Sequence, residues 1–462
     1  MSELDEILDA IKNAGGRPMF VGGCVRDRIF GNPSEDIDIE VFGLSMSQLI
    51  GVLTKFGETS VDGNTFATAR IKRLPFDFSL PRTDRKVGLG HTGFDIEIIP
   101  DASFEDAALR RDFTINSVMS DALTGEIADP FGGINDLQDG VLRMTSPDSF
   151  SDDPLRVLRG MQFCGRFDLF PDIPTADAML NAKSEFRTIS IERTWKEWEK
   201  WAALSERPSS GMRCLTVSGW VDLWPMLNDM IGLQQNPEHH PEGDAWEHTL
   251  QVVDIAAAQA INNNLCREDR AILVFAALCH DMGKPATTAL DGDGNIITHG
   301  HDVVGATVAE LFLEKIGAPA IVVSRVCALV REHMASISFY GGISNKTVRR
   351  LANRLQPSNI EEWFMLVNAD FRGRGDPERG NPPGASKILE LAREMEIDFN
   401  APRPILMGRH LINHMHPGVE MGNILRQAFE AQLDGEFFNV DEALDWAQLN
   451  FDVGRTDRLC ES

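Results

Sequence analysis

Two hydrophobic periods alternate along the first part of the chain. An apolar run at 19–21 and alternating apolar and polar positions at 36–41 and 65–82 predict strands, because a half-buried strand repeats every two residues. The segments 25–30 and 44–57 have the apolar spacing of helices. Strands and helices mixed in this order predict an α+β domain with a mixed sheet.

From about residue 146 onward the pattern is helical almost throughout. Breaks rich in Pro, Gly or charged residues at about 205–240 and at 375–386 interrupt it, since such composition seldom continues a helix. The predicted organisation is a head at 1–145, a helical neck at 146–235, a helical domain at 236–380 and a helical tail at 381–462.

The densest group of candidate site residues lies in the head. Asp36 and Asp38 are two apart on a predicted strand and share one face, where two carboxylates repel each other unless a divalent cation lies between them. Gly22-Gly23 opens a helix with bare backbone N–H groups, and Arg26 follows one turn later, which suits a triphosphate. Alone, an Asp-x-Asp is most often a pair of solvated acids and a Gly-Gly a simple turn. Their order and spacing predict a metal-dependent nucleotidyl transfer site.

A capped helix is predicted after the strands of the head. Ser103 is a good N-cap, and the helix from Glu105 to Arg111 is expected to continue, so that Asp112 and Asn116, four apart, lie on one side. By itself this string is a surface helix with exposed arginines.

An acid and two arginines share a flank of the first neck helix. Asp153, Arg156 and Arg159 follow one another at spacings of three, so a carboxylate that accepts from an exocyclic amine lies beside a guanidinium that donates to ring acceptors. A lone Asp-x-x-Arg is more often a surface salt bridge worth a few tenths of a kcal/mol. Further along, Arg193 and Glu197 are expected to pair at i,i+4.

Histidines and carboxylates recur on separate predicted helices in the second half. They are His248, His280, Asp281, His301, His333 and Asp370. Imidazole and carboxylate groups that converge from different helices are a usual way to hold a transition metal. The apolar helix that ends at the His-Asp pair would leave that pair poorly solvated without a metal or partners.

The overall charge limits how the chain can bind nucleic acid. The 462 residues carry a formal net charge of −26, which argues against RNA binding through a broad basic face, because phosphate contacts dominate nucleic-acid affinity. Basic residues do cluster locally at 70–73, 82–86 and 110–111. We therefore expect a small RNA footprint that is sensitive to salt.

Cysteine usage and hydropathy bear on location. Seven cysteines without a Cys-x-x-Cys pair indicate neither a disulfide framework nor a zinc ribbon, which favours a reducing cytoplasm. The segment 1–16 has the pattern of an acidic amphipathic helix rather than a signal peptide. No apolar run approaches the ~18 residues of a membrane span, so no membrane association is expected.

The string GG-x-VRD-x8-D-x-D, followed by RRDFTIN at 110–116, resembles the DNA polymerase beta type nucleotidyltransferases. Within them it is similar to the class II tRNA nucleotidyltransferases (CCA-adding enzymes) and the bacterial poly(A) polymerases. The resemblance implies a polymerase-beta-type head in which Mg²⁺ is bound by Asp36, Asp38 and a third carboxylate. Asp77, followed by Arg82, matches the third position, and Asp95 and Glu97 are its rivals.

The same resemblance implies roles for the other motifs. Arg110 and Arg111 would contact the triphosphate, while Asp112 and Asn116 would hold the ribose. In the neck, the families usually have Glu-Asp-x-x-Arg, whose Asp and Arg select ATP or CTP; here Asp152 replaces the Glu, and Asp153 and Arg156 stand at the two selecting positions.

The string HDMGKP and its flanking ligands resemble the HD superfamily of metal-dependent phosphohydrolases. The resemblance implies that His248, His280, Asp281 and Asp370 bind a divalent transition metal (Mn, Ni, Fe or Co). His301 and His333 would be further ligands of the two-metal subtype or residues that contact phosphate.

These features lead to one main function and several alternatives. The main hypothesis is template-independent addition of CMP and AMP from CTP and ATP to the 3′ end of tRNA, with A addition or poly(A) tailing as alternatives. An HD phosphohydrolase acting on nucleotides or RNA ends is the alternative from another class. A non-catalytic RNA-binding protein is disfavoured because both transferase motifs are intact.

Overall fold

The computed structural model describes residues 2–31, 37–61, 68–86, 94–335, 342–376, 378–451 and 453. Asp36 and the side chains of Asp95 and Asp152 lie outside this described part of the chain. The chain forms two compact units, Met1–Trp224 and Pro225–Ser462. Among the described helices, none has both the length and the hydropathy to cross a membrane.

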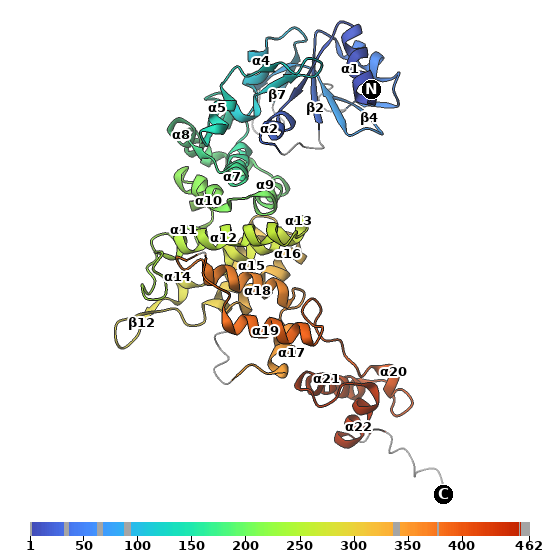
Figure 1. The fold of residues 1–462 in the computed structure, drawn as a ribbon, viewed down its shortest axis with the longest axis vertical. Coiled ribbons are helices and arrows are strands. Elements are labelled where there is room, and N and C mark those ends of the chain that lie inside the picture. Colours follow the sequence, from blue (N-terminus) through green and yellow to red (C-terminus); the bar gives the residue numbers. More distant parts are fainter. Residues whose placement is uncertain are drawn as a thin grey trace. The chain divides into compact units, whose positions relative to one another are not determined.

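The head is built on a seven-stranded mixed sheet, in the order β3-β4-β5-β2-β1-β8-β9 (Figure 1). β1 is antiparallel to β2 and β8, and β2 is parallel to β5. The strands are β1 (Arg17–Val21), β2 (Ile37–Phe42), β3 (Thr59–Val61), β4 (Thr68–Ile71), β5 (Phe76–Ser79), β8 (Met119–Asp121) and β9 (Ile127–Ala128). A separate hairpin consists of β6 (Arg82–Lys86) and β7 (Phe94–Ile98).

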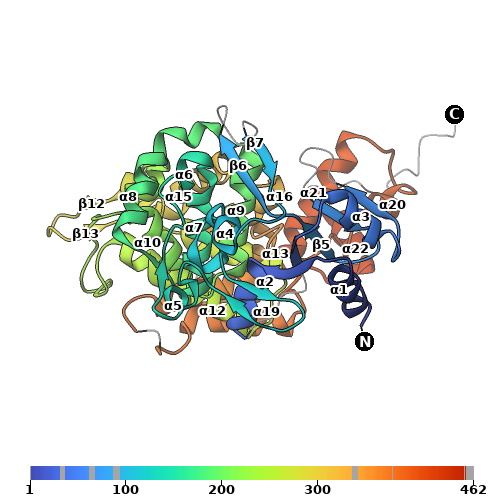
Figure 2. The same cartoon turned by 90° about the horizontal axis from the view of Figure 1, so that it is seen from above.

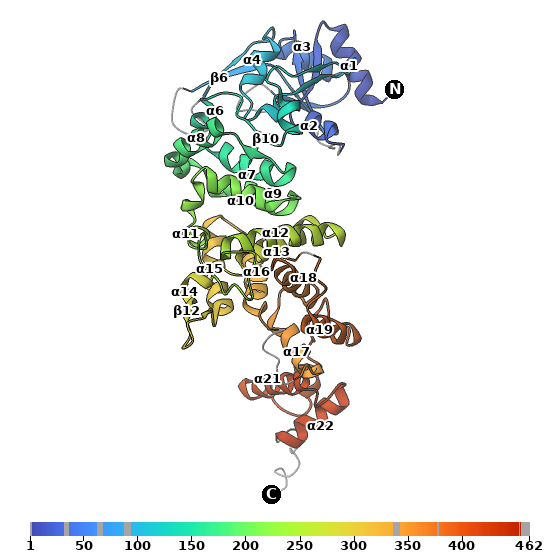
Figure 3. The same cartoon turned by 60° about the vertical axis from the view of Figure 1, so that its left-hand side comes forward.

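Apolar residues from helices and strands form the core of the head. The helices are α1 (Glu3–Asn13), α2 (Gly23–Ile29), α3 (Met46–Leu53), α4 (Phe104–Leu109) and α5 (Gly133–Gln138). α1 and α3 lie side by side (Figures 2 and 3). Ile11 of α1, Leu49 of α3 and Ile39 of β2 belong to the same buried cluster. The alternating pattern of β2 therefore buries its apolar positions against helices, as the sequence predicts.

The helix predicted from Glu105 onward is shorter than expected. α4 ends at Leu109, Phe113 is extended (φ −131°, ψ 153°), and only a 3₁₀ turn, η1 (Thr114–Asn116), follows. Phe113 is fully buried and pairs across the chain with Met144. This tertiary pairing overrides the local helical pattern.

Helices of the neck pack around a tryptophan core. Its elements are α6 (Ser149–Asp152), α7 (Leu155–Phe167), α8 (Ile173–Asn181), α9 (Ile191–Leu204), α10 (Pro208–Val217), the 3₁₀ helices η2 (Ala182–Thr188) and η3 (Trp220–Leu223), and the short parallel pair β10 (Val141–Leu142) and β11 (Phe170–Pro171). α7 packs against both α9 and α10 (Figures 1 and 3). Trp198 and Trp201 are fully buried, and Trp198 packs edge-on against Trp201 and Trp224. These tryptophans are core residues.

The second unit is helical. Its elements are α11 (Pro225–Asn228), α12 (Ala245–Asn262), α13 (Arg267–Cys279), α14 (Lys284–Thr287), β12 (Ala289–Leu290), β13 (Ile296–Ile297), α15 (His301–Lys315), α16 (Ala320–Glu332), α17 (Asn345–Arg354), α18 (Ile360–Arg372), α19 (Pro383–Glu394), α20 (Gly408–Leu411), α21 (Val419–Asp434) and α22 (Val440–Asn450). α13 packs against α12, α15, α16 and α18. Every residue of α13 from Ala271 to Cys279 is buried, which is why its sequence is apolar on all sides. The tail helices α20–α22 share a separate hydrophobic core.

Candidate active site and metal centre

Strand register brings two of the predicted carboxylates together in the head. β2 and β5 are parallel neighbours, and Asp38 lies directly opposite Asp77. Asp38 is exposed, and Asp77 is paired with Arg70 of the next strand. Residues opposite each other on adjacent strands point to the same face of the sheet. The pair therefore fits a divalent cation, which takes carboxylate oxygen ligands.

A third carboxylate on the same face of β2 holds two arginines. Glu40 is fully buried, and its Oε1 accepts a hydrogen bond from Arg110 Nη2 while its Oε2 lies 3.4 Å from Arg111 Nη2. Burial and the adjacent Arg110 lower the pKa of the Arg111 guanidinium, and the charges of Glu40 and Asp38 oppose that shift. The predicted triphosphate arginines are thus fixed beside the acidic strand.

The Gly-Gly turn lies next to the same arginine. Gly22 has a φ of +69°, a conformation that favours glycine, and it precedes the first residue of α2. A Cβ atom at Gly22 would lie 3.5 Å from Arg111 Nη1, which places this guanidinium beside the turn. Backbone N–H groups, a guanidinium and acidic strands converge here. Arg82, at the start of β6, is half-buried.

The predicted ribose pair is hydrogen-bonded although the helix that was expected to carry it is absent. Asn116 Nδ2 donates to Asp112 Oδ1 (2.9 Å), and Arg159 Nε of α7 donates to Asp112 Oδ2 (2.7 Å). Burial would raise the pKa of the Asp112 carboxyl, but Arg159, Asn116 and Arg156 together lower it to about 2. The carboxylate is therefore ionised, and the neck helix is tied directly to the RRDFTIN segment.

The predicted base-reading pair is held by contacts on both sides. Asp153 precedes α7, and its Oδ2 accepts from Arg193 Nη2 (2.6 Å), so Arg193 pairs with Asp153 and not with Glu197 as expected. Glu197 pairs instead with Lys200. Arg156 Nη2 donates to the carbonyl oxygen of Arg110 (2.8 Å). The contact between Arg193 and Asp153 joins the residue before the N-cap of α7 to the first turn of α9.

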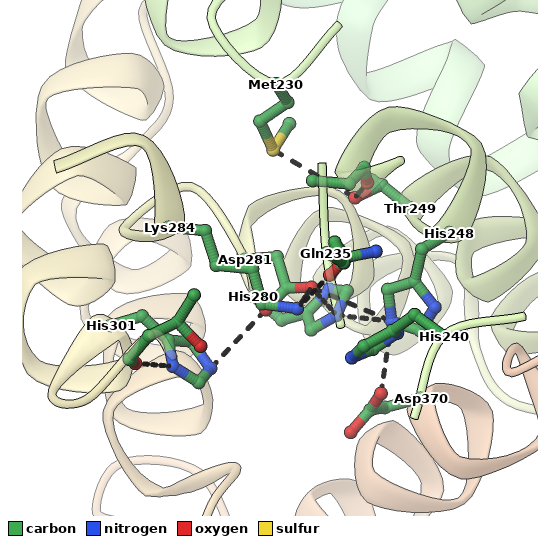
Figure 4. A network of polar contacts seen from close by, with 12 residues as sticks. Met230, Gln235, His240, His248, Thr249, His280, Asp281, Lys284, His301 and Asp370 are labelled. Atoms are coloured by element: carbon green, nitrogen blue, oxygen red, sulfur yellow. Dashed lines mark hydrogen bonds and ion pairs between the residues drawn. The ribbon is translucent and has the colours of Figure 1, made fainter. Parts of the chain in front are cut away.

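The predicted HD ligands converge from the ends and faces of five buried segments (Figure 4). His248 lies on α12, His280-Asp281 follow α13, His301 begins α15, His333 follows α16, and Asp370 lies on α18. The ligand atoms of His248, His280 and Asp370 lie within 4.8 Å of one another, and those of Asp281, His301 and His333 form a second such group.

Backbone contacts fix the tautomers of three of these histidines. The Nδ1 atoms of His280, His301 and His333 lie 2.7, 2.7 and 2.6 Å from the carbonyl oxygens of Ala277, Thr298 and Val330. Because a carbonyl only accepts, Nδ1 carries the proton and Nε2 presents a lone pair. His280 Nε2 faces His248 Nε2 at 3.3 Å, and His301 Nε2 faces His333 Nε2 at 3.1 Å. The facing lone pairs of His301 and His333 fit a shared cation, and His248 Nε2 also lies 3.1 Å from Asp370 Oδ1.

Charges at the centre favour the same conclusion. Burial and the neighbouring His301 and His280 lower the pKa of His333 to about 4, which leaves the imidazole neutral, as a metal ligand must be. Burial would lower the pKa of His248, but Asp370 and Glu242 raise it above its usual value. The centre therefore attracts positive charge. The residues fit a divalent metal.

Asp281 lies between the two groups of ligands. Its Oδ2 is 3.2 Å from His280 Nε2 and its Oδ1 is 3.4 Å from His301 Nε2. Lys284 Nζ also lies 2.6 Å from Oδ2, so this lysine pairs with the carboxylate. A carboxylate with one oxygen toward each group can bridge two metal ions. A cleft of about 680 Å³ borders the centre, and His240, Lys284, His299 and His301 are part of its lining.

Two glutamates with clear contacts were missed in the sequence. Glu40 stands two residues beyond Asp38, and the period of the strand already places both on one face. Glu242 has a fully buried side chain, and its Oε1 lies 2.7 Å from His248 Nδ1 and 2.9 Å from His240 Nδ1. It orients His248 as a carboxylate behind a metal ligand does. The string HPEGDAWEH at 240–248 was the available signal, because it places the carboxylate of Glu242 shortly before the candidate ligand His248.

Comparison with known proteins supports both halves of this description. Residues 19–143 match the model of the Poly A polymerase head domain, and residues 245–362 match the HD domain. The CCA-adding enzyme of Bacillus stearothermophilus in complex with CTP has a similar fold, with a TM-score of 0.66 over 97% of this chain and 96% of that chain at 20% identity. The Thermotoga maritima CCA-adding enzyme complexed with tRNA has a TM-score of 0.57 over 96% of this chain and 94% of that one at 17% identity.

Similarity in sequence extends over most of the chain. The multifunctional CCA protein of Xylella fastidiosa (strain M23) is 31% identical over 419 residues, which are 88% of this chain and 94% of that protein. The multifunctional CCA protein of Actinobacillus pleuropneumoniae serotype 5b (strain L20) is 33% identical over 386 residues, 81% of this chain and 89% of that protein. With a nucleotidyltransferase head, an HD domain and this extent of identity, the chain belongs to the family of multifunctional CCA proteins.

Proposed function

We propose that this chain adds CMP and AMP from CTP and ATP to the 3′ end of tRNA. The observation that carries the proposal is the opposed pair Asp38 and Asp77 beside Gly22 and Arg111. Carboxylates for a metal and a cationic turn for phosphates are the two halves of a nucleotidyl transfer site. A chain that acts on tRNA would work in the cytoplasm.

In this proposal each group of the head has one task. Bound at Asp36, Asp38 and Asp77, two Mg²⁺ ions would lower the pKa of the RNA 3′-hydroxyl and neutralise the departing pyrophosphate. The 3′-oxygen attacks the α-phosphorus, and the bond from that phosphorus to the pyrophosphate oxygen breaks. Arg110 and Arg111, kept in place by Glu40, neutralise the triphosphate, with the N–H groups at Gly22-Gly23 and the nearby Arg82 as further donors. Asp112 and Asn116 hold the ribose.

Base choice belongs to the start of α7. Asp153 accepts from Arg193, and Arg156 donates to a backbone carbonyl, so both side chains are held before a nucleotide arrives. A carboxylate beside a guanidinium matches an amine beside a ring acceptor, a pattern that adenine and cytosine share. ATP and CTP are therefore the expected substrates. A-only addition and poly(A) tailing use the same edge and are separated by experiment.

The direct test supplies tRNA transcripts that lack the terminal CCA, CA or A, with each labelled NTP in turn. With each NTP supplied alone, CCA addition predicts incorporation of C on the first and second transcripts. It predicts incorporation of a single A on the third transcript. Growth of long A tails would instead identify a poly(A) polymerase. No incorporation on any transcript, by protein that is folded by circular dichroism, would contradict the proposal.

A second function is favoured by the ligand geometry of the HD centre. We propose that His248, His280, Asp281 and Asp370 bind a divalent transition metal (Mn, Ni, Fe or Co), with His301 and His333 completing a second position through Asp281. The metal would lower the pKa of a bound water and so supply a nucleophile for phosphoester hydrolysis. Lys284 fixes the Asp281 carboxylate, and Glu242 fixes His248.

This second proposal is tested on metal-depleted full-length protein. The protein is reloaded with each of the four metals, and hydrolysis of p-nitrophenyl phosphate and bis(p-nitrophenyl) phosphate is measured. At least one metal should restore hydrolysis, and two metal ions per HD centre would support the second position. Stoichiometric metal binding without hydrolysis of either ester would leave the HD centre a structural metal site.

A further inference from the structure

Arg26 lies beside the Gly-Gly turn, where a Cβ atom at Gly23 would be 3.5 Å from its Nη2, but its hydrogen bonds go to protein acceptors. Its side chain is only 4% exposed, and its Nε and Nη2 donate to Asp27 Oδ1 at 2.8 and 2.7 Å. Nη1 donates to Asn116 Oδ1. Arg166 of α7 lies 3.5 Å from the other oxygen of Asp27. Three of the five N–H groups of the guanidinium therefore donate to protein acceptors within the head.

Two aromatic rings of the neck cover the same guanidinium. The Arg26 Cζ atom lies 4.5 Å from the ring centroid of Phe167 and 5.0 Å from that of Phe163, both on α7. The quadrupole of an aromatic ring attracts a cation over its face. Arg26 thus links α2, which begins at the Gly-Gly turn, with the helix whose first turn carries the base-reading pair.

Arg26 also determines which way the amide of Asn116 points. Because a guanidinium only donates, Asn116 must present Oδ1 to Arg26, and its Nδ2 is then directed to Asp112 Oδ1 (2.9 Å). Arg159 fixes the other oxygen of Asp112 (2.7 Å). The two side chains that hold the ribose are therefore oriented by two arginines, one from α2 and one from α7.

We propose that Arg26 is a positioning residue for ribose recognition and not a ligand of the triphosphate. The proposal rests on the nucleotidyl transfer function proposed above, in which Asp112 and Asn116 contact the sugar. Arg26 acts through Asn116. It selects the amide orientation in which Asn116 donates to Asp112, and so it fixes how the two side chains are arranged toward the ribose. Discrimination against nucleotides that lack a ribose hydroxyl is the property it controls.

The test compares sugar discrimination with phosphate affinity in Arg26→Lys. Lysine keeps the charge but lacks the planar fork that reaches Asp27 and Asn116 together. The ratio of kcat/KM for ATP to that for 2′-deoxy-ATP or 3′-deoxy-ATP should fall about tenfold or more, since a hydrogen bond to a charged group is lost behind Asn116. The inhibition constant of pyrophosphate should change less than about twofold.

A double-mutant cycle with Asn116→Ala tests the route. If Arg26 acts through Asn116, adding Arg26→Lys to Asn116→Ala should produce no further loss of sugar discrimination. The matched control is Arg28→Lys, an exposed arginine on the same helix whose guanidinium lies over Phe20. This control should keep both the sugar ratio and the pyrophosphate constant of the wild type.

Several results would overturn the proposal. A raised pyrophosphate constant with an unchanged sugar ratio would make Arg26 a phosphate ligand, and an equal loss for all three nucleotides would make it a purely structural residue. If Arg26→Lys does not fold, Asp27→Asn, which weakens the anchor of the same guanidinium, takes its place with the same expected direction. Failure of the wild type to incorporate ATP would refute the transfer function itself, which is a distinguishable outcome.

Discussion

The transferase site and the HD centre hold their candidate metal ligands in opposite ways. In the head, Asp38 is exposed on a strand and Asp77 has an arginine partner. In the HD centre, His301 and His333 are buried, with their Nε2 lone pairs facing each other. Buried polar groups that face one another without a partner are costly.

This difference implies different times of metal binding. The HD ligands are complete without substrate, so a transition metal should stay bound to the purified protein. Mg²⁺ is usually held by one or two carboxylates together with substrate phosphates. We therefore expect the metal of the head to arrive with the nucleotide, whose phosphates Arg110 and Arg111 are proposed to neutralise.

The largest expected effect follows from removing a carboxylate of the head. Asp38→Ala should lower the rate of nucleotide incorporation about a thousandfold, because a metal supplies several kcal/mol of transition-state stabilisation. Its melting temperature should not change, since Asp38 is exposed. Asp101→Ala, another exposed aspartate of the head, is the control and should be fully active. Normal incorporation by Asp38→Ala would refute the assignment of the metal site.

The HD centre should be separable from transfer. The double variant His280→Ala/Asp281→Ala is expected to lose its bound transition metal and any phosphoester hydrolysis, because both ligands that follow α13 are gone. Incorporation of ATP and CTP should remain within about twofold of the wild type, because mutations at distant sites without shared partners act independently. Loss of transfer in a double variant that melts normally would mean that the two sites are coupled.

The sequence predicts the sites best where candidate ligands recur at short spacing. Asp38 lies on a strand, the Gly-Gly turn opens α2, and the HD ligands converge as expected. Sequence could not reveal that Asp77 lies opposite Asp38, because register between β2 and β5 is set by long-range pairing. The predicted helix ends before Phe113 for a similar reason, because Phe113 is buried and pairs with the distant Met144.

Glu40 was missed because its partners are distant in sequence. Glu40 contacts Arg110 and Arg111 seventy or so positions later, and Arg26, which the sequence assigned to the triphosphate, contacts Asn116 ninety positions later. Local periodicity carries no information about such pairs. The expected pairing of Arg193 with Glu197 was wrong, because Asp153, which is distant in sequence, binds the Arg193 guanidinium instead.

Removal of the base-reading arginine should have an intermediate effect. Each bidentate contact contributes roughly 1–3 kcal/mol of discrimination, so Arg156→Ala should relax selectivity for ATP and CTP over UTP and GTP about tenfold to a hundredfold. Steady-state kcat/KM for the four nucleotides measures it. Arg187→Ala, an arginine on η2 of the neck, serves as the control with unchanged selectivity. Parallel losses for all four nucleotides would show that the base is read elsewhere.

The smallest expected effect concerns acid stability. The pKa of Asp112 is lowered to about 2, so its ion pairs stabilise the fold above the ordinary carboxyl pKa of about 4 and are lost as the pH falls through about 2. Asp112→Asn should therefore cost about 2 kcal/mol near pH 6. The gap in melting temperature between wild type and variant should close between pH 4 and pH 2. A gap that is constant over this range would mean that Asp112 does not contribute through its charge.

The contrast between the two sites is tested most directly by equilibrium binding of Mn²⁺, which serves both as a transition metal and as a substitute for Mg²⁺. Binding is followed by electron paramagnetic resonance of the full-length protein, with and without CTP. The account predicts Mn²⁺ binding without nucleotide that His280→Ala/Asp281→Ala abolishes, and additional Mn²⁺ only with CTP that Asp38→Ala abolishes. Nucleotide-independent binding that survives the HD double variant and disappears in Asp38→Ala would contradict it.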